Sequence, residues 1–244
     1  MPKSMTPDEL NSHVSSATAR LSSLFSDWTS SGNKKLVDKA KLVAYWIKDY
    51  VSYLRREGTF SPKSVPRLKR GSVVVVDFGF RLGAEFGGRH FAVVVDNGND
   101  WTSPIVTVVP MFSLKESYKP NAYTCKLKDG IYAPMIKKTS ELVAKAMEIT
   151  DEISSIPSDM KSSVEVKAKT DAAAEMATRA AVMLDEIEHM KEGSVANTCQ
   201  ITTISKMRIK RPLKKDDPLY GLRLSTEDME LINQQLSRLF LFPK

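Results

Sequence analysis

The stretch that decides the fold reads Lys69-Arg70-Gly71-Ser72-Val73-Val74-Val75-Val76-Asp77. Its four consecutive valines are β-branched and form a run too short for a helix, so they predict a buried strand. Similar runs predict strands at Phe91–Val95, Ile105–Val109 and Tyr123–Leu127. Between the first two lies segment 78–90, whose four glycines allow tight turns and a close approach of the backbone to a ligand. We therefore expect a sheet with a glycine-rich loop between its first two strands.

Two helices are expected before this sheet. Thr6-Pro7-Asp8-Glu9 has the cap, the proline and the acidic residue that are typical of a helix start. Apolar residues then recur at helical spacing up to Trp28, and again from Leu36 to Leu54. Residues 1–58 are thus expected to form an antiparallel helical hairpin. Residues 59–68, with two prolines, are expected to be a linker.

Helical periodicity returns after the sheet. Residues 136–192 are predicted to form a second helical hairpin, turning at Ser154–Asp159, and the two hairpins are expected to pack together as a four-helix unit. The alternative is that this acidic hairpin covers a basic groove of the sheet domain as a built-in inhibitor and moves when a nucleic acid or a protein partner binds. Strand character resumes over Ser194–Ile204. A last helix is expected from Ser225, with Asp228 in the reciprocal capping position. The predicted fold class is α+β.

Composition excludes several classes of protein. The 244 residues are 42% hydrophobic and 27% charged, which is typical of a globular chain and not of a disordered one. No apolar run reaches the roughly 18 residues of a membrane span, and the polar start does not resemble a signal peptide. Two cysteines and three isolated histidines predict neither a disulfide framework nor a metal site built by the protein. We expect a cytoplasmic protein without metal or cofactor.

Charge is distributed unevenly along the chain. Residues 34–70 contain 11 basic and 3 acidic residues, and residues 206–215 contain 6 basic and no acidic ones. Residues 139–192 contain 6 basic and 12 acidic residues. Basic zones of this kind indicate a polyanionic partner, although solvated helix faces would also account for the part of the first zone before residue 57.

A series of short motifs links the strands in a fixed order. It consists of Lys69-Arg70-Gly71-Ser72-Val73 through Asp77, Gly83-Ala84-Glu85, Gly87-Gly88, His90-Phe91-Ala92-Val93-Val94, Ser103-Pro104, Val109-Pro110, Ser194-Val195 and Gln200-Ile201-Thr202-Thr203-Ile204-Ser205-Lys206-Met207-Arg208-Ile209. No single motif is specific, but the ordered series is difficult to obtain by chance. Over about 69–114 and 194–240, the chain resembles the PemK/MazF toxin family.

The resemblance implies a small SH3-like β-barrel over 69–244, interrupted by the insertion 136–192. It also implies a two-fold homodimer that cleaves single-stranded RNA and is blocked by an antitoxin. An acidic protein is the preferred antitoxin, and an RNA is the alternative. An alternative function is a nucleic-acid-binding regulatory module on the same barrel, without catalysis.

RNA cleavage without a metal requires a group that takes the proton of the 2′-hydroxyl and groups that stabilise the phosphorane. We expect His90 as general acid/base, Arg89 as the charge stabiliser, Ser113 as a phosphate ligand and Glu85 beside them. The sequence departs from the family here. The catalytic arginine of the family falls on His90, and its threonine falls on Phe112. A shift of one residue in a strand turns the side chain to the other face, so the choice between Arg89 and His90 stays open.

Further residues are expected to contact RNA, and each also has a structural interpretation. Glu85 could pair with Arg81, and Trp101 could stack on a base or pack within its own loop. The candidates for RNA binding are Lys69, Arg70, Arg81, Trp101, Gln200, Thr203, Lys206 and Arg208.

Overall fold

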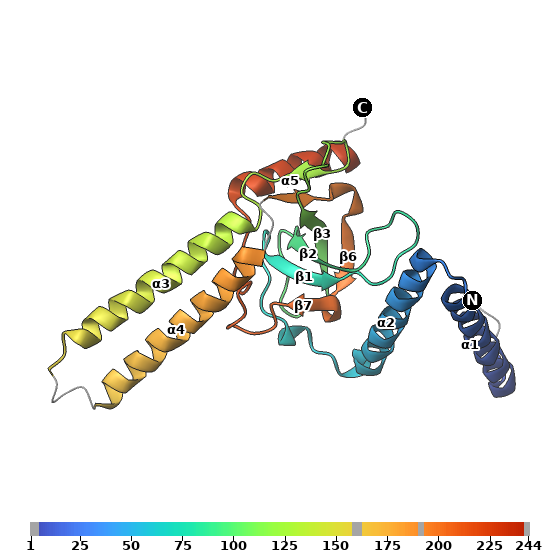
Figure 1. Cartoon of the computed structure of the whole chain (residues 1–244), viewed down its shortest axis with the longest axis horizontal. Helices are drawn as coiled ribbons and strands as arrows, with labels where there is room; N and C mark the ends of the chain where they lie inside the picture. The colour runs from blue at the N-terminus through green and yellow to red at the C-terminus, as the bar shows by residue number, and fades with distance from the viewer. Residues whose placement is uncertain (1–4, 158–162, 190–192, 242–244) are drawn as a thin grey trace. The chain divides into compact units, whose positions relative to one another are not determined.

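The computed structural model describes residues 5–157, 163–189 and 193–241 (Figure 1). The chain divides into two compact units, residues 1–58 and residues 59–244. Among the described residues, no helix has both the length and the apolar character that crossing a bilayer requires.

The first unit is the predicted helical hairpin. It consists of α1 (Pro7–Ser30) and α2 (Lys34–Arg56). The Thr6 side chain accepts a hydrogen bond from the Glu9 amide, and the Glu9 carboxylate accepts one from the Thr6 amide, which confirms the predicted helix start. No residue of α1 is buried, and in α2 only Ala40 and Tyr53 are buried.

The second unit is built on an antiparallel sheet. Its strands are β1 (Val73–Asp77), β2 (Arg89–Val94), β3 (Ile105–Ser113), β4 (Cys125–Lys126), β5 (Ser194–Ala196), β6 (Thr202–Ser205) and β7 (Ile209–Arg211). The strand order is β4-β5-β3-β2-β1-β7, and β6 also pairs with β3. The α+β class is confirmed. Within the described residues the sheet stays open, because β4 and β7 end the path, so the expected SH3-like barrel closure is not seen.

Each face of the sheet is packed against other parts of the chain. One face carries Val73, Val93 and Val109, and it packs against apolar residues of the helical segments, among them Met135, Ile187 and Ile232. The other face carries Val74, Val76, Ala92 and Val94, and it packs against Val65, Leu68 and Phe86. Alternate residues of a strand point to opposite faces, and both faces of this sheet are buried. This explains why the first strand is a continuous run of valines rather than an alternation of apolar and polar residues.

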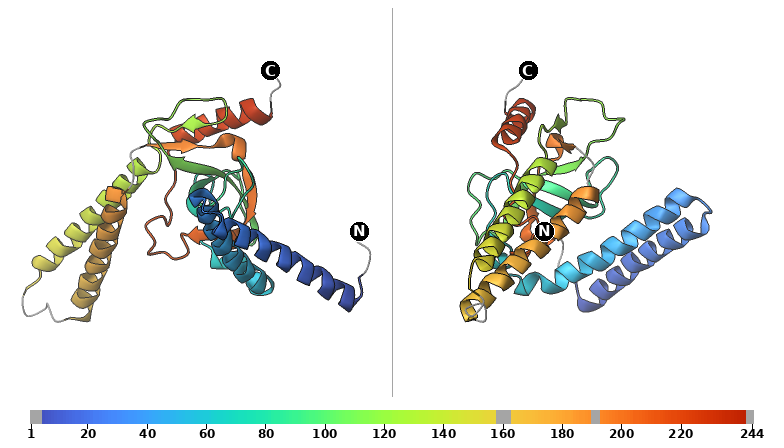
Figure 2. Two further views of the ribbon diagram at one scale, coloured as in Figure 1. Left: turned by 45° about the vertical axis from the view of Figure 1, so that its right-hand side comes forward. Right: turned by 60° about the vertical axis from the view of Figure 1, so that its left-hand side comes forward.

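A helical hairpin extends from this sheet, as both views of Figure 2 show. It consists of α3 (Tyr132–Ser154) and α4 (Val164–His189), so the helical segment begins four residues before the expected 136. Its expected turn lies partly outside the described residues. The two hairpins are expected to pack together as one four-helix bundle. Since the two hairpins fall in different units, that packing stays a prediction.

Three details of the C-terminal part differ from expectation. The continuous strand expected over 194–204 is interrupted by a 3-10 turn, Thr198–Gln200, and the short strand β7 was not predicted. The last helix, α5 (Thr226–Phe240), begins after Ser225 as expected. The Asp228 side chain does not complete a capping box, because it accepts hydrogen bonds from the backbone amides of 128–130 and is fully buried.

Candidate active site

The glycine-rich loop returns the chain from β1 to β2. The amide of Phe78 donates to the Gly88 carbonyl and that of Gly88 to the Gly79 carbonyl, both at 2.8 Å, so the two arms of the loop are held together. A Cβ atom at position 87 would lie 2.8 Å from the Gly79 carbonyl oxygen, closer than atoms can approach. Glycine at position 87 therefore allows the close approach that brings Phe86 over the start of β2.

A groove opens where β2 and β3 separate. The two strands pair only over Ala92–Val94 and Val108–Pro110. Pro110 has no N–H group to donate, which weakens the ladder at this point. Beyond it, Met111–Ser113 pairs with β5 on the opposite edge of β3. Within the described residues, Arg89–Phe91 and Met111–Ser113 thus have no ladder between them and provide two walls of the groove.

The groove has a volume of about 930 Å³. Its basic and aromatic residues come from both strands and from the segments beside them. The described lining residues include no carboxylate; they are Val75, Phe86, Arg89, His90, Phe91, Met111, Phe112, Ser113, Lys115, Ile131, Ser194 and Arg211. Three of the four predicted catalytic residues, Arg89, His90 and Ser113, therefore line one groove.

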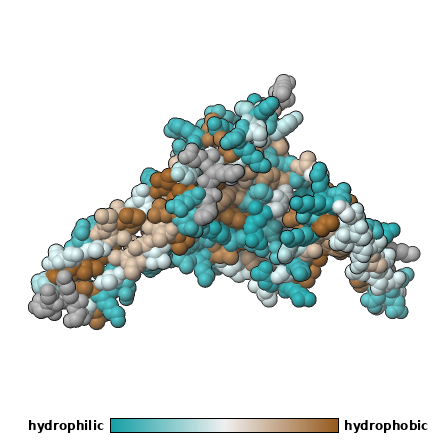
Figure 3. All heavy atoms as spheres, viewed as in Figure 1, coloured by the Kyte–Doolittle hydropathy of each residue, from teal (hydrophilic) through white to brown (hydrophobic). Residues whose placement is uncertain are grey.

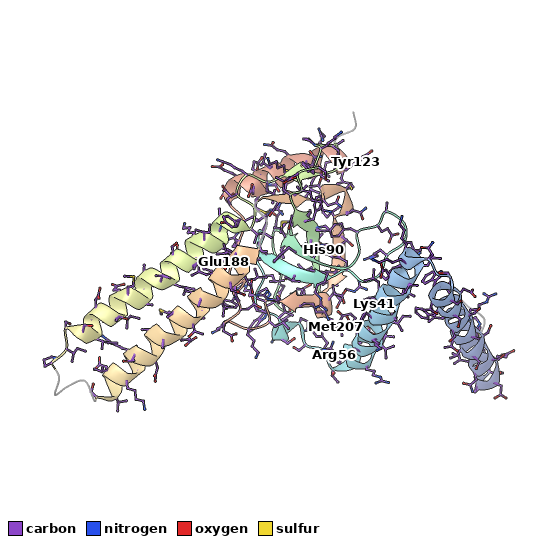
Figure 4. The ribbon with its side chains drawn as sticks, in the orientation of Figure 1. Lys41, Arg56, His90, Tyr123, Glu188 and Met207 are labelled. Atoms are coloured by element: carbon purple, nitrogen blue, oxygen red, sulfur yellow. The ribbon has the colours of Figure 1, made fainter. Side chains whose placement is uncertain are left out.

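His90 is half-buried in β2, and Figure 4 shows it at the sheet. Its ring lies 4.6 Å from the Phe86 ring, measured between centroids. Burial lowers the pKa of His90 from its ordinary value of 6.5, and a hydrogen bond with the Gly87 backbone opposes this shift in part. The imidazole is consequently neutral at pH 7 and able to accept a proton.

Arg89 and Ser113 lie at the ends of the two separating strands, and both are exposed. Arg89 faces Asp77 across the β1–β2 ladder, and Ser113 faces Ser194 across the β3–β5 ladder. Arg89 and His90 belong to opposite faces of β2, yet both line the groove because it is open at the strand end. Since both side chains line the groove, the two residues need not be alternatives for facing the phosphate.

Glu85 is not part of the groove lining. It is exposed, and its carboxylate lies 3.9 Å from the guanidinium of Arg81. The Arg81 Nε atom donates to the Phe78 carbonyl at 3.1 Å. The structural interpretation, a pair between Glu85 and Arg81 that braces the loop, describes this contact better than a catalytic role for Glu85.

Lys69 and Arg70 lie before β1, away from the groove. The Arg70 guanidinium donates to the Val95 carbonyl, just beyond the end of β2 opposite His90, and to the Asn233 side chain of α5. Lys69 is exposed at the same end. Arg70 therefore attaches α5 to the sheet, and the expected contact of this pair with an RNA in the groove is not supported by their position.

Trp101 and Lys206 also lie far from the groove. The Trp101 indole donates to the Val65 carbonyl at 2.9 Å, and the Lys206 ammonium donates to the Asp100 carbonyl at 2.9 Å. Lys206 is only 1% exposed, and burial lowers its pKa. Both residues are near the first residue of β3, and Ser113 is the last residue, about 26 Å away at the rise of a strand. Buried Lys206 is a structural residue and not an RNA contact.

The remaining candidates contact the sheet or the loop. The Thr203 hydroxyl lies 3.0 Å from that of Thr107 on the sheet surface. The Gln200 side chain accepts from the Phe86 amide at 3.3 Å and donates to the Ala84 carbonyl at 3.4 Å, so it holds the glycine-rich loop. Arg208 donates to the Phe78 carbonyl at 3.4 Å. These contacts give Gln200 and Arg208 an indirect role in positioning the loop.

Two basic residues of the groove, Lys115 and Arg211, were not among the predicted site residues. Arg211 belongs to the basic segment 206–215, which indicated a polyanionic partner but singled out no residue of the site. The Arg211 guanidinium contacts Asp217 at 2.9 and 3.0 Å and Glu186 of α4 at 2.7 Å. Through this ion pair α4 of the helical hairpin contacts the groove wall. No sequence pattern indicated it, since the two residues are 25 positions apart.

The chemistry available in the groove is proton transfer beside a concentration of positive charge. A neutral imidazole, a hydroxyl and three cationic side chains line one cavity. Such groups are able to hold a phosphodiester and to move a proton at its neighbouring hydroxyl. Within the described parts of the chain, no three His, Cys, Asp or Glu side chains are grouped so as to hold a metal ion.

Residues 69–150 match the family model of the PemK-like, MazF-like toxin of type II toxin-antitoxin systems. This confirms the resemblance over β1 to β4 and most of α3, including Arg89, His90, Phe112 and Ser113. The match continues past residue 136, so the start of the expected insertion lies inside it. Segment 194–240 is not part of the match, and its resemblance stays a prediction. No curated protein matches the chain.

Proposed function

We propose that this protein is a toxin of a toxin–antitoxin system and cleaves single-stranded RNA without a metal ion. The proposal depends mainly on one observation: Arg89, His90 and Ser113 line the same groove, and all three lie inside the segment that matches the family model. Arg89, Lys115 and Arg211 supply positive charge to the groove lining, which favours an anionic ligand, although the Arg211 guanidinium is shared with Asp217 and Glu186.

In the proposed reaction the neutral imidazole of His90 takes the proton of a ribose 2′-hydroxyl. The 2′-oxygen attacks the adjacent phosphorus, and the bond from phosphorus to the 5′-oxygen breaks. A proton is returned to that oxygen, so the products are a 2′,3′-cyclic phosphate and a 5′-hydroxyl. Arg89 and Lys115 stabilise the phosphorane charge, and the Ser113 hydroxyl donates to a phosphate oxygen.

The test is incubation of the purified protein with a long unstructured RNA in EDTA. We expect fragments with cyclic phosphate at one end and 5′-hydroxyl at the other. Cleavage that requires magnesium after RNA folding is controlled, or fragments with 5′-phosphate, would contradict the mechanism.

A partner and an assembly also belong to the proposal. The toxin family implies an antitoxin, and the basic groove favours an acidic protein that competes with RNA for it. We propose a homodimer in the cytoplasm. Copurification of the chain with the product of a neighbouring small acidic reading frame, and loss of cleavage in that complex, would support this partner.

One observation favours the second candidate function, a regulatory nucleic-acid-binding module. Phe112 stands where the family resemblance has threonine, and its ring is part of the groove wall. If the protein binds RNA and DNA in the groove but cleaves neither under any of these conditions, the regulatory module is the better description.

A further inference from the structure

One part of the groove is aromatic. The Phe86 ring lies in the middle of a cluster, with ring centroids 4.6 Å from His90, 5.7 Å from Phe78 and 6.4 Å from Phe112. Phe78 is buried, whereas Phe86 and Phe112 are half-buried and line the groove. Phe86 and Phe112 therefore present ring surface to whatever enters.

Cations lie beside these rings. Arg89, Lys115 and Arg211 line the same groove as Phe86 and Phe112. The volume of about 930 Å³ is near the upper end of the range for small-molecule sites, which extends to roughly 1,000 Å³. A ligand that complements both parts has a flat apolar ring and a negative charge a few bonds away. A nucleotide has this chemistry.

From this arrangement we propose that Phe86 and Phe112 form a stacking site for one unpaired nucleobase, next to the phosphate held by Arg89 and Ser113. The proposal rests on the proposed RNA substrate and adds a way of selecting it. A base that is stacked on a protein ring is unavailable for pairing, so the site selects single strands.

This site is separate from Trp101, for which the sequence leaves both base stacking and packing within its own loop open. The Trp101 indole is hydrogen-bonded to Val65 at the far end of β3. Phe112 is adjacent to Ser113 on the same strand and is thus one residue from a proposed phosphate ligand.

The experiment measures binding and not cleavage. The probe is a fluorescent single-stranded 2′-O-methyl RNA, which lacks the free 2′-hydroxyl needed for the proposed reaction. A second set of probes has one abasic position each. Fluorescence anisotropy gives the affinity of every probe for the full-length wild type, Phe112→Ala, Phe112→Tyr and Phe240→Ala. Phe240 is an exposed phenylalanine of α5 and serves as the matched control.

We expect Phe112→Ala to weaken the complete probe about tenfold, a change within the range for loss of one base–aromatic stack. One abasic probe lacks the base that would stack on Phe112. For that probe, Phe112→Ala and the wild type should have the same affinity. Phe112→Tyr keeps the ring and should bind as the wild type does, and so should Phe240→Ala. Thermal unfolding by circular dichroism verifies that each variant is folded.

Two results would overturn the stacking site while leaving the proposed function intact. Phe112→Ala could bind the complete probe as tightly as the wild type, or it could weaken complete and abasic probes equally. Absence of binding by the folded wild type to any probe would instead overturn the proposed function together with this inference.

Discussion

At the scale of single residues, the groove combines a neutral imidazole with exposed cations. His90 and Arg89 are neighbours in β2, and both line the groove because the strand end is open on each side. Their chemical abilities differ. Burial lowers the pKa of His90, which makes it a proton acceptor at neutral pH, whereas the planar guanidinium of Arg89 can donate two hydrogen bonds to phosphate oxygens.

Replacement of these two residues separates the roles. His90→Ala should reduce cleavage by at least about a hundredfold, the usual contribution of a positioned acid or base, while RNA affinity changes little. Arg89→Ala should weaken both cleavage and binding, because it removes a cation from the groove. Single-turnover cleavage and anisotropy with an uncleavable RNA provide the two measurements. Normal cleavage by His90→Ala together with loss of cleavage by Arg89→Ala would identify the arginine as the catalytic residue.

The pH dependence of cleavage reports on the same imidazole. A general base must be unprotonated, so activity is lost as pH falls through the pKa of His90. Because burial lowers this pKa, the acid limb should lie below the ordinary value of 6.5. A profile of kcat/KM against pH measures it, with acid stability of the fold as the control. A limb above 6.5, or a loss of rate on the alkaline side alone, would rule out a base with a lowered pKa.

At the scale of elements, the site depends on a short loop and on a strand ladder that ends early. The glycine-rich loop is held by its own backbone hydrogen bonds and by the Gln200 side chain. On one edge, β3 pairs with β2 only as far as Pro110, and on its opposite edge Met111–Ser113 pairs with β5. The groove lies between β2 and β3 beyond the end of their ladder.

A methyl group added to the loop tests its geometry. Gly87→Ala places a Cβ atom 2.8 Å from the Gly79 carbonyl oxygen, so the loop must shift. We expect the free energy of unfolding to fall by about 1–3 kcal/mol. We also expect the folded variant to cleave RNA more slowly than the wild type, because the shifted loop moves Phe86 and the start of β2. Gly98→Ala is the matched control, since its Cβ would meet no atom within 4 Å. Urea unfolding and cleavage assays measure both effects, and equal behaviour of the two variants would show that the loop tolerates the shift.

At the scale of the whole molecule, the second unit connects a long acidic hairpin with a basic groove. Glu186 of α4 contacts Arg211 in the groove wall, and Ile187 beside it is buried in the core under the sheet. Figure 4 labels Glu188 at this end of α4. Farther along, α3 and α4 enclose an apolar groove of about 660 Å³, and Figure 3 shows apolar residues along the hairpin. Removal of the hairpin would therefore also remove part of the core.

A point substitution tests the electrostatic contribution of the hairpin without this loss. Glu186→Gln leaves the contacts between Arg211 and Asp217 in place. It removes the negative charge of Glu186, which competes with a phosphate for the Arg211 guanidinium. RNA affinity should rise, because one competing negative charge is gone. The rise should be only about two- to fivefold, because a partly exposed ion pair contributes little free energy. Glu175→Gln makes the same charge change elsewhere on α4 and should have no such effect. Weaker binding by Glu186→Gln would show that the carboxylate instead holds Arg211 in its binding position.

Many local features could be predicted from the sequence, because they depend on neighbouring residues. The Thr6–Glu9 cap, the strand Val73–Asp77 and the start of α5 after Ser225 all follow from patterns within a few positions. β7 was missed because three residues with two charged side chains have no strand pattern.

The sequence by itself determined the alternation of helical and strand segments and placed Arg89, His90 and Ser113 among the candidates. Only the tertiary structure decided which candidates meet. Lys206 reads as a surface cation but is buried, and Arg70 lies at the opposite end of β2 from His90. Conversely, Phe112 and Arg211 join the groove from separate strands. The physical reason is that periodicity reports only which side of its own element a residue occupies. The neighbours of a side chain depend on strand order, on the register of each ladder and on the point at which two strands separate.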